Sequence, residues 1–188
     1  MFSSNHCRFF DLFLVILFTP FWVSLTLFCL FAVYIFDGKP FFFMHKRVGL
    51  NGKIFYLYKI RTMRLNNKGV NEITKVGKFL RKASLDEIPQ FFNVIMGNMS
   101  IVGPRPMPYE ALNGIDKDKI KIRNSVLPGL TGLSQIHSLG VKRAFEEKLD
   151  LDILFAKNFE CKLYFTIILK TPKTLIRRFI NNKTGDTL

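Results

Sequence analysis

Two adjacent carboxylates, Asp86 and Glu87, are the first candidates for chemistry in this 188-residue chain. The segment from Lys39 to Arg105 contains 13 basic residues and only three acids, two of which are this pair. Nearby cations favour the ionised form of a carboxylate, although a like charge beside it opposes ionisation. We therefore expect Asp86 to be ionised and able to act as a nucleophile or a metal ligand.

The residues that follow this pair suit phosphate binding. Arg105 lies in the sequence Gly-Pro-Arg-Pro-Met-Pro (residues 103–108), where three prolines exclude helix and central strand and predict a stiff loop. A guanidinium on such a loop can hold two phosphate oxygens at once. Mg²⁺ typically takes one or two carboxylates together with substrate phosphates, so Asp86 and Glu87 are also candidate magnesium ligands. Together these residues predict phosphoryl transfer.

A structural interpretation of the acidic pair is also open. Ser84, Leu85, Asp86 and Glu87 match the S-x-x-E capping box that begins a helix, and the apolar run 88–96 follows, with Gly97 as a natural end. Acids in the first turn of a helix also oppose its dipole. This interpretation explains acids at a helix start, but it does not explain the surrounding excess of cations.

The elements that would position these residues are mixed in type. Residues 41–48 and 54–63 are rich in aromatic and branched side chains and flank a glycine-containing turn, which predicts a β-hairpin. The hairpin would bring four basic side chains near one edge: Lys46, Arg47, Lys59 and Arg61. Helices are expected over residues 73–82, 109–124 and 142–158, with a Pro/Gly loop over 127–132. The predicted class is α+β and mostly helical.

The first 38 residues differ in composition from the rest. They contain three charged side chains, and residues 12–36 form a run of 25 uncharged residues. A helix of that length exceeds a hydrocarbon layer of about 30 Å. Thr19 and Pro20 interrupt the run, because proline lacks a donor and collides with the carbonyl four residues back. Two interpretations stay open: a kinked spanning helix, or a re-entrant helix-break-helix in which Ser or Thr side chains satisfy the freed carbonyl.

The other 150 residues carry 27 Lys/Arg and 12 Asp/Glu, a balance of +15. Arg8 precedes the apolar run and Lys39, Lys46 and Arg47 follow it, and this excess of flanking cations predicts a cytoplasmic domain. Residues 162–180 interleave apolar and basic side chains, which is typical of a helix in an anionic membrane interface, bent or split at Pro172. A helix that packs on the core with a solvated basic face is the alternative. The cysteines at 7, 29 and 161 show no C-x-x-C spacing and are expected to be free thiols.

Two motifs together resemble a known signature. S-L-D-E-I-P-Q at residues 84–90 and V-G-P-R-P at 102–106 resemble the bacterial sugar transferases, the small monotopic polyprenyl-phosphate phosphoglycosyl transferases. Further matches lie in the same order at residues 8–11, 47–49, 58–63, 128–132 and 151–152. The resemblance covers essentially the whole chain.

The resemblance implies a reaction. Such an enzyme moves a sugar 1-phosphate from a nucleoside diphosphate sugar, here expected to be a UDP-sugar, to polyprenyl (undecaprenyl) phosphate and releases UMP, the first membrane step of bacterial glycan assembly. Asp86 would attack the sugar-bearing phosphorus and form a covalent intermediate. Glu87, with Asp86, would hold Mg²⁺. We expect the substrate and phosphate contacts from six residues: Arg105, Lys59, Arg61, Arg47, Gln90 and Pro104.

The resemblance also implies an organisation. Residues 1–38 would be a re-entrant membrane anchor broken at Thr19 and Pro20, and residues 39–188 a compact cytoplasmic catalytic domain with amphipathic C-terminal interfacial helices. The expected location is the bacterial inner membrane, with anionic lipids and downstream glycosyltransferases as partners. Nucleic acid is not expected, because no recognition motif appears. A membrane-anchored basic binding module and a catalytically impaired relative are the alternatives.

Several positions depart from the family's pattern. The family usually has a basic residue at Cys7, Arg at Leu127, Trp-Ala at residues 133–134, another segment from His137 onward, and an acid at Tyr164. These differences concern nucleotide and sugar contacts more than the chemistry. Lys142 or Arg143 would be candidates to supply missing charge, and we expect His137 to be a packing or surface residue.

Overall fold

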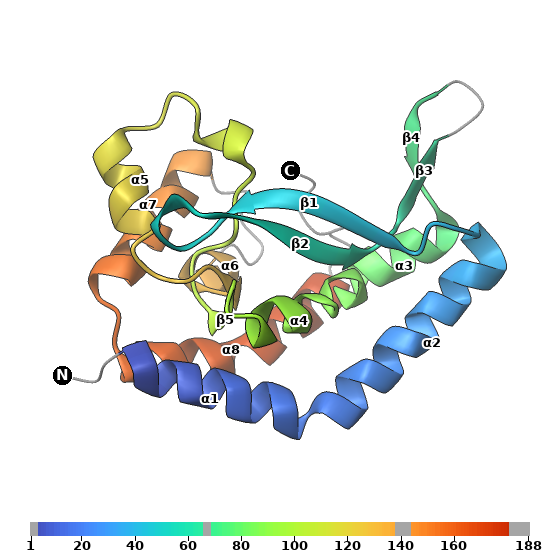
Figure 1. Cartoon of the computed structure of the whole chain (residues 1–188), viewed down its shortest axis with the longest axis horizontal. Helices are drawn as coiled ribbons and strands as arrows, with labels where there is room; N and C mark the ends of the chain where they lie inside the picture. The colour runs from blue at the N-terminus through green and yellow to red at the C-terminus, as the bar shows by residue number, and fades with distance from the viewer. Residues whose placement is uncertain (1–3, 66–68, 138–143, 181–188) are drawn as a thin grey trace.

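The computed structural model describes residues 4–65, 69–137 and 144–180 (Figure 1). Within these ranges the chain is mostly helical and carries three two-stranded sheets. The predicted α+β class is confirmed. Two positions invoked for extra charge, Lys142 and Arg143, lie outside the described residues.

The apolar N-terminal run forms two helices, α1 (Ser4–Leu17) and α2 (Thr19–Asp37), separated at Phe18. Figure 1 shows them, in blue, meeting at an elbow. The carbonyl oxygen of Val15 accepts hydrogen bonds from Thr19 Oγ1 (2.9 Å) and Trp22 Nε1 (3.0 Å), so side chains satisfy it at the break. The predicted interruption at Thr19 and Pro20 is confirmed, with Pro20 in the first turn of α2 where a missing donor costs little.

Only α2, among the helices of the described residues, is long and apolar enough to cross a membrane. Its buried side chains, Trp22, Thr26, Cys29 and Val33, recur at helical spacing and form one face. The other faces of α2 expose large apolar side chains, including Phe21, Leu27, Phe28 and Phe36. One stripe of α2 therefore packs on the protein and the remainder is open.

The predicted hairpin is confirmed as β1 (Phe42–Val48) and β2 (Ile54–Ile60), antiparallel with Lys46 opposite Tyr56. A second antiparallel pair follows, β3 (Met63–Leu65) and β4 (Asn71–Ile73). Helix α3 (Lys75–Lys82) falls inside the predicted range and begins where Thr74 accepts a hydrogen bond from Gly77 N.

The predicted capping box is wrong. Ser84 takes a left-handed conformation (φ 57°) and its side chain makes no capping hydrogen bond. Residues Leu85–Glu87 form a single 3-10 turn, and α4 (Gln90–Ile95) starts only after Pro89. Gly97 does end this segment, with φ 80°. The acidic pair therefore lies on a tight turn between α3 and α4 and not in the first turn of a longer helix.

Two further predictions need correction. The expected loop at 127–132 contains β6 (Gly129–Thr131), which pairs in parallel with β5 (Ser100–Val102). The expected helix at 109–124 is two pieces, a 3-10 turn Tyr109–Leu112 and α5 (Lys117–Arg123), because Gly114 between them has φ 82°. The strand β6 forms because it pairs with the distant strand β5. The expected helix is divided because Gly114 takes a left-handed conformation.

The C-terminal half is helical: α6 (Leu133–His137), α7 (Phe145–Lys157) and α8 (Cys161–Ile180). Helix α8 runs through Pro172 as one element, so of the predicted bend or split the split does not occur. Tyr164, Ile167 and Thr174 of α8 are buried, whereas Leu169 and Ile176 are exposed. One face of α8 packs on the core, as the second interpretation predicts, and the other exposes apolar and basic side chains; the membrane-interface interpretation stays a prediction.

Buried side chains of the described residues form three clusters, and each includes residues of α1 or α2. Cys7 joins the cluster of β5, α6, α7 and α8; Val15 and Trp22 join that of β2 and α4; Cys29 and Val33 join that of β2 and α3. The three cysteines are free, as predicted. The apolar helices are thus part of the fold's core and not a separate appendage.

Candidate active site

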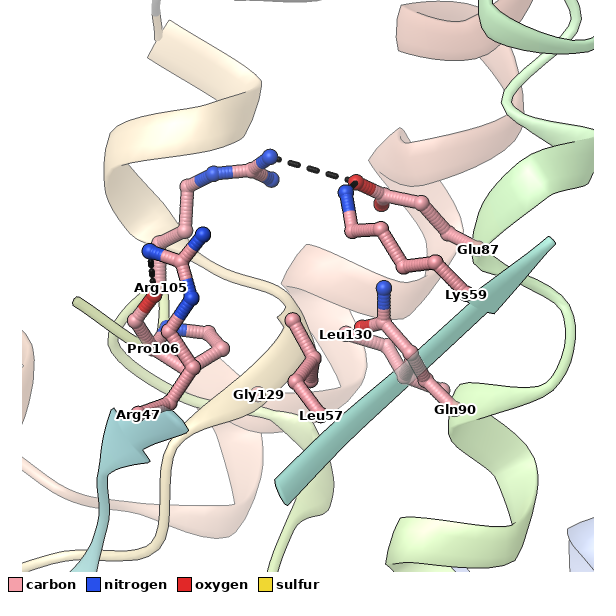
Figure 2. A pocket seen from close by; sticks show the side chains of 9 residues that line it. All are labelled: Arg47, Leu57, Lys59, Glu87, Gln90, Arg105, Pro106, Gly129 and Leu130. Carbon is pink, nitrogen blue, oxygen red and sulfur yellow. Dashed lines mark hydrogen bonds and ion pairs between the residues drawn. The ribbon is translucent and has the colours of Figure 1, made fainter. Parts of the chain in front are cut away.

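The acidic pair sits beside the hairpin. Glu87 Oε1 accepts a hydrogen bond from Lys59 Nζ of β2 at 2.7 Å and another from Arg105 Nη2 at 3.2 Å. Asp86 Oδ2 lies 4.0 Å from the same Lys59 nitrogen. Figure 2 shows Arg105 and Lys59 converging on Glu87 from opposite walls of a pocket. The structure therefore brings the predicted nucleophile, the predicted metal ligand and two predicted cations together from three separate segments.

The titration of Asp86 differs from our expectation. The side chain is only 7% exposed, and this burial, followed by the neighbouring charge of Glu87, raises its pKa above the ordinary value. Lys59 and Arg81 act in the opposite direction but do not cancel these two effects. The neighbouring cations do not make Asp86 unusually acidic, because removal from water outweighs their attraction.

Arg81, in the last turn of α3, is a site residue that our reading of the sequence did not single out. Its charge lowers the pKa of Asp86, and its Nε donates to Thr62 Oγ1 at 2.7 Å. The only signal in the sequence was its membership of the basic run before Asp86. Its place beside the carboxylate depends on the left-handed turn at Ser84, which returns the chain toward α3.

The loop that carries Arg105 is held at four successive carbonyl groups. Pro104 O accepts from Gly129 N (2.9 Å), Arg105 O from Arg123 Nη2, Pro106 O from Arg47 Nη1 (3.3 Å), and Met107 O from Val48 N (3.0 Å). The donors come from β6, α5 and β1. The predicted stiffness is confirmed, and it comes from these contacts as well as from the prolines.

A pocket lies between the hairpin and this loop. It is lined by Arg47, Leu57, Lys59, Glu87, Gln90, Arg105, Pro106, Gly129 and Leu130, most of which Figure 2 shows facing a common space. Burial and the neighbouring Arg105 lower the pKa of Arg47. Two guanidinium groups held close together repel each other, so an anion between them would relieve this repulsion. The charge of the pocket lining is thus suited to an anion such as phosphate.

Two predicted binding residues lie outside the lining of this pocket. Arg61 donates to the carbonyl oxygens of Asp37 (2.7 Å), Gly38 (2.8 Å) and Lys39 (3.2 Å), so its guanidinium holds the end of α2. Pro104 is buried behind the loop, where its carbonyl accepts from Gly129. Both residues were predicted to contact substrate or phosphate. Their hydrogen bonds in the structure instead hold the main chain around the site.

A buried ion pair, Arg123 with Asp152, stands behind the Arg105 loop and was not predicted as part of the site. The side chains lie 2.8 Å apart and are almost completely inaccessible. Burial raises the pKa of Asp152, and Arg123 opposes this shift. Residues 151–152 match the family's pattern, which was the one sign in the sequence that Asp152 belongs with the site. The sequence did not indicate that its partner is Arg123, 29 positions away.

The residues present are compatible with Mg²⁺. Within the described ranges no cluster of three or more His, Cys, Asp or Glu side chains exists. Mg²⁺ takes one or two carboxylates and completes its shell with phosphate oxygens and water. Adjacent Asp86 and Glu87 supply that number of carboxylates beside a cation-lined pocket, and Glu87 Oε1 already accepts from two cations.

Known proteins resemble the chain along most of its length. The model of the bacterial sugar transferase family matches residues 2–178. The uncharacterized sugar transferase EpsL of Bacillus subtilis is 38% identical over 146 residues, which cover 74% of this chain and 71% of EpsL. The galactosyl transferase CpsE of Streptococcus agalactiae is 36% identical over 163 residues, 74% of this chain and 35% of CpsE.

A third relative is the undecaprenyl-phosphate galactose phosphotransferase of Salmonella typhimurium, 34% identical over 166 residues, which cover 76% of this chain and 34% of that protein. The chain thus matches about a third of the length of two of these relatives and most of EpsL. The site motifs, the fold around them and the match over residues 2–178 agree: this chain belongs to the bacterial sugar transferase family.

Proposed function

We propose that the chain is a membrane phosphoglycosyl transferase that moves a sugar 1-phosphate from a UDP-sugar to undecaprenyl phosphate. The observation that carries the proposal is the group of charges in which Glu87 meets Lys59 and Arg105 in the pocket. Asp86 does not line the pocket but directly precedes Glu87 in the chain, 4.0 Å from the same Lys59 nitrogen. Relatives named as undecaprenyl-phosphate galactose phosphotransferase and UDP-glucose:undecaprenyl-phosphate glucose-1-phosphate transferase support the choice of substrates.

The chemistry would proceed in two displacements. A carboxylate oxygen of Asp86 forms a bond to the sugar-bearing phosphorus of the donor, and the bond from that phosphorus to the bridging oxygen breaks, which releases UMP. A phosphate oxygen of the lipid then attacks the same phosphorus and frees Asp86. Splitting the transfer in this way requires a nucleophile that is ionised when it attacks.

The surrounding residues would each have a part in the first displacement. Arg105 and Arg47 would bind the diphosphate and stabilise the charge that develops on the departing UMP. Lys59, 4.0 Å from Asp86 and 2.7 Å from Glu87, would favour the ionised carboxylate. Glu87 and Asp86 would hold Mg²⁺, which when bound neutralises phosphate charge.

The contacts of the apolar helices favour a re-entrant anchor. Near its start, Arg8 donates to Ile95 O and Met99 O, and Asp11 accepts from Ile101 N. At its end, Asp37 accepts from Thr74 Oγ1 at 2.7 Å, and its carbonyl accepts from Arg61. Both ends of the apolar run are thus bound to the same catalytic domain. A path across the membrane would place these two ends on opposite sides. We infer that the elbow dips into the cytoplasmic leaflet of the inner membrane.

Helix α8 would lie in the same interface. Its exposed Leu169, Ile176 and Ile180 would enter the lipid, while Lys170 and Lys173 would meet anionic headgroups. Figure 1 shows α8 along the same side of the protein as α1. The pocket would then open near the surface where a polyprenyl phosphate presents its headgroup.

The test of the chemistry uses purified full-length protein with Mg²⁺, undecaprenyl phosphate and a panel of UDP-glucose, UDP-galactose and UDP-N-acetylgalactosamine. We expect UMP release with one donor and, before the lipid is added, a phosphosugar adduct visible by intact mass. Asp86→Asn should abolish both, whereas Asp118→Asn, the same change on an exposed acid, should abolish neither. An adduct that persists in Asp86→Asn would exclude Asp86 as the nucleophile, and no turnover with any donor would contradict the proposed reaction.

The test of the anchor is a single labelling site before α1. A Ser3→Cys variant in intact spheroplasts should stay shielded from a membrane-impermeant thiol reagent and become labelled after permeabilisation. Labelling in intact spheroplasts would mean that the segment spans the membrane.

A further inference from the structure

We propose that the buried Arg123–Asp152 pair is positioning machinery for the donor diphosphate: it fixes the main chain of Arg105 and so aims the Arg105 guanidinium into the pocket. This inference rests on the proposed function. Neither member of the pair lines the pocket, so neither is a catalytic residue.

Arg123 is 1% exposed and uses its whole fork in this arrangement. Its Nε and Nη2 donate to Asp152 Oδ2 at 3.1 Å and 2.8 Å, and its Nη1 donates to Asn124 Oδ1 at 3.1 Å. The same Nη2 also donates to the carbonyl oxygen of Arg105. One guanidinium therefore joins α5, α7 and the loop that presents the phosphate ligand.

Stability alone does not explain a charged pair at this depth. The desolvation cost of two buried charges often exceeds their mutual attraction, and apolar side chains of similar volume frequently stabilise a fold as well or better. The hydrogen bond to Arg105 O is the contact that an apolar pair cannot provide. We therefore attribute the presence of the pair to its contact with the loop and not to a gain in core stability.

The donor to the Arg105 carbonyl comes from a different side than the donors to the neighbouring carbonyls. The neighbouring carbonyls of Pro104, Pro106 and Met107 accept from Gly129, Arg47 and Val48, of which Gly129 and Arg47 line the pocket. The carbonyl of Arg105 itself accepts from α5, behind the site. Loss of that donor would free the peptide group after Arg105, one of the two whose orientation sets the direction of the Arg105 side chain.

The end of α5 also fixes the hairpin. The carbonyl oxygen of Asn124, next to Arg123, accepts from Asn51 N at 2.7 Å in the turn between β1 and β2. Those strands carry Arg47 and Lys59. The end of α5 thus contacts both the Arg105 loop and the turn of the hairpin that carries Arg47 and Lys59.

The decisive variant is Arg123→Met/Asp152→Leu, which removes the donor to Arg105 O without leaving a lone buried charge. We expect a thermal midpoint near that of the parent and a kcat/KM for the UDP-sugar lowered on the order of 100-fold, because small misplacements of a binding group cost that much. In an Arg105→Ala background the same double change should cause little further loss, because both act through one guanidinium.

Two additional variants control for misfolding and for the loss of an ion pair. Arg123→Lys retains the charge but lacks the planar fork, so it should show the same loss and the same dependence on Arg105 even if the apolar double variant folds poorly. Lys119→Gln/Asp150→Asn removes an exposed ion pair (3.7 Å) between the same two helices and should leave kcat/KM unchanged.

The outcomes separate the two proposals. A parent that turns over, an Arg105→Ala variant that is impaired and an Arg123→Met/Asp152→Leu variant with parental kcat/KM would overturn the positioning role while leaving the transferase reaction intact. Losses that multiply in the Arg105→Ala background would overturn it as well, because the pair would then act by another route. A parent without turnover would contradict the proposed function and this inference with it.

Discussion

Arg61 joins the apolar helices to the rest of the protein, and its removal should loosen that joint. Its guanidinium donates to three carbonyl oxygens at the end of α2, at 2.7, 2.8 and 3.2 Å. The C-terminal end of a helix carries partial negative charge, so a cation there is favourable as well as hydrogen-bonded. The change Arg61→Ala removes all of these interactions and leaves the backbone of β2 in place.

The expected cost follows from these contacts. The two short hydrogen bonds are only partly buried, so each contributes about 1–1.5 kcal/mol, at the low end for charged donors. The interaction with the helix end adds about 0.5 kcal/mol. The sum, about 2.5–3.5 kcal/mol, corresponds to a decrease in Tm of roughly 5–14 °C for a domain of this size.

The protein contains its own reporter for this experiment. Its single tryptophan, Trp22, lies in α2, is 3% exposed and contacts the rings of Phe91 and Phe92 in α4. Thermal unfolding in detergent micelles, followed by tryptophan fluorescence, should show the earlier release of α2 in Arg61→Ala. The Tm of Arg61→Lys should lie between those of the parent and Arg61→Ala, because an ammonium group cannot reach three carbonyl oxygens at once.

Lys53→Ala is the matched control, since it removes the same charge from an exposed position in the hairpin turn. A Tm for Arg61→Ala within about 1 °C of the parent would refute the assignment of Arg61 to the joint. An equal decrease in Lys53→Ala would attribute the effect to net charge and not to the carbonyl contacts.

Three further outcomes are expected. The pKa of Asp86 is raised in the folded protein, so its ionised form destabilises the fold at neutral pH. Asp86→Asn should therefore raise the free energy of unfolding at neutral pH. This gain should shrink as pH falls through the folded-state pKa and vanish below the unfolded-state pKa of about 3.9. Tyr164→Phe removes the hydroxyl that donates to Asp11 at 2.5 Å and should cost about 1–3 kcal/mol in denaturant unfolding. Gly103→Ala would drive a Cβ into the carbonyl oxygen of Leu127, so we expect about 1–3 kcal/mol of destabilisation in urea titration.

Each of these outcomes has a control. Asp118→Asn should show no comparable gain at neutral pH. Tyr34→Phe alters an exposed ring and should leave the unfolding free energy unchanged. Gly52→Ala meets open space but retains a positive φ of 79°, so it should cost only about 1 kcal/mol. A Gly103→Ala variant no less stable than Gly52→Ala would show that β5 and β6 can separate without loss.

Features that depend on short stretches of chain were predicted well. The hairpin, the interruption at Thr19 and Pro20, and the stiff loop around Arg105 each follow from side-chain branching, proline geometry and spacing within about ten residues. The capping box at Ser84 and the single helix over residues 109–124 were local predictions that failed. The pattern at Ser84 is correct for a helix start, but a left-handed turn there returns the chain toward α3 and places Asp86 beside Arg81.

Features that depend on distant segments were not predictable in this way. The parallel pairing of β5 with β6 joins residues about 30 apart, and Arg123 meets Asp152 across 29 positions. Arg61 shows the same difficulty, because a basic residue near the site is equally suited to a phosphate or to a helix end. Only the position of α2 decides between these partners.

The sequence by itself determined the chemical groups of this protein: an acidic pair in a basic field, an arginine between prolines, and an apolar run with a break. These are properties of residue type and near spacing, and they are also what identified the family. The tertiary structure alone decided which groups meet. Burial gave Asp86 its raised pKa, four donors from distant elements immobilised the Arg105 loop, and contacts at both ends of the apolar run joined it to one body. Burial and long-range hydrogen bonds depend on how the whole chain packs, so no local pattern contains them.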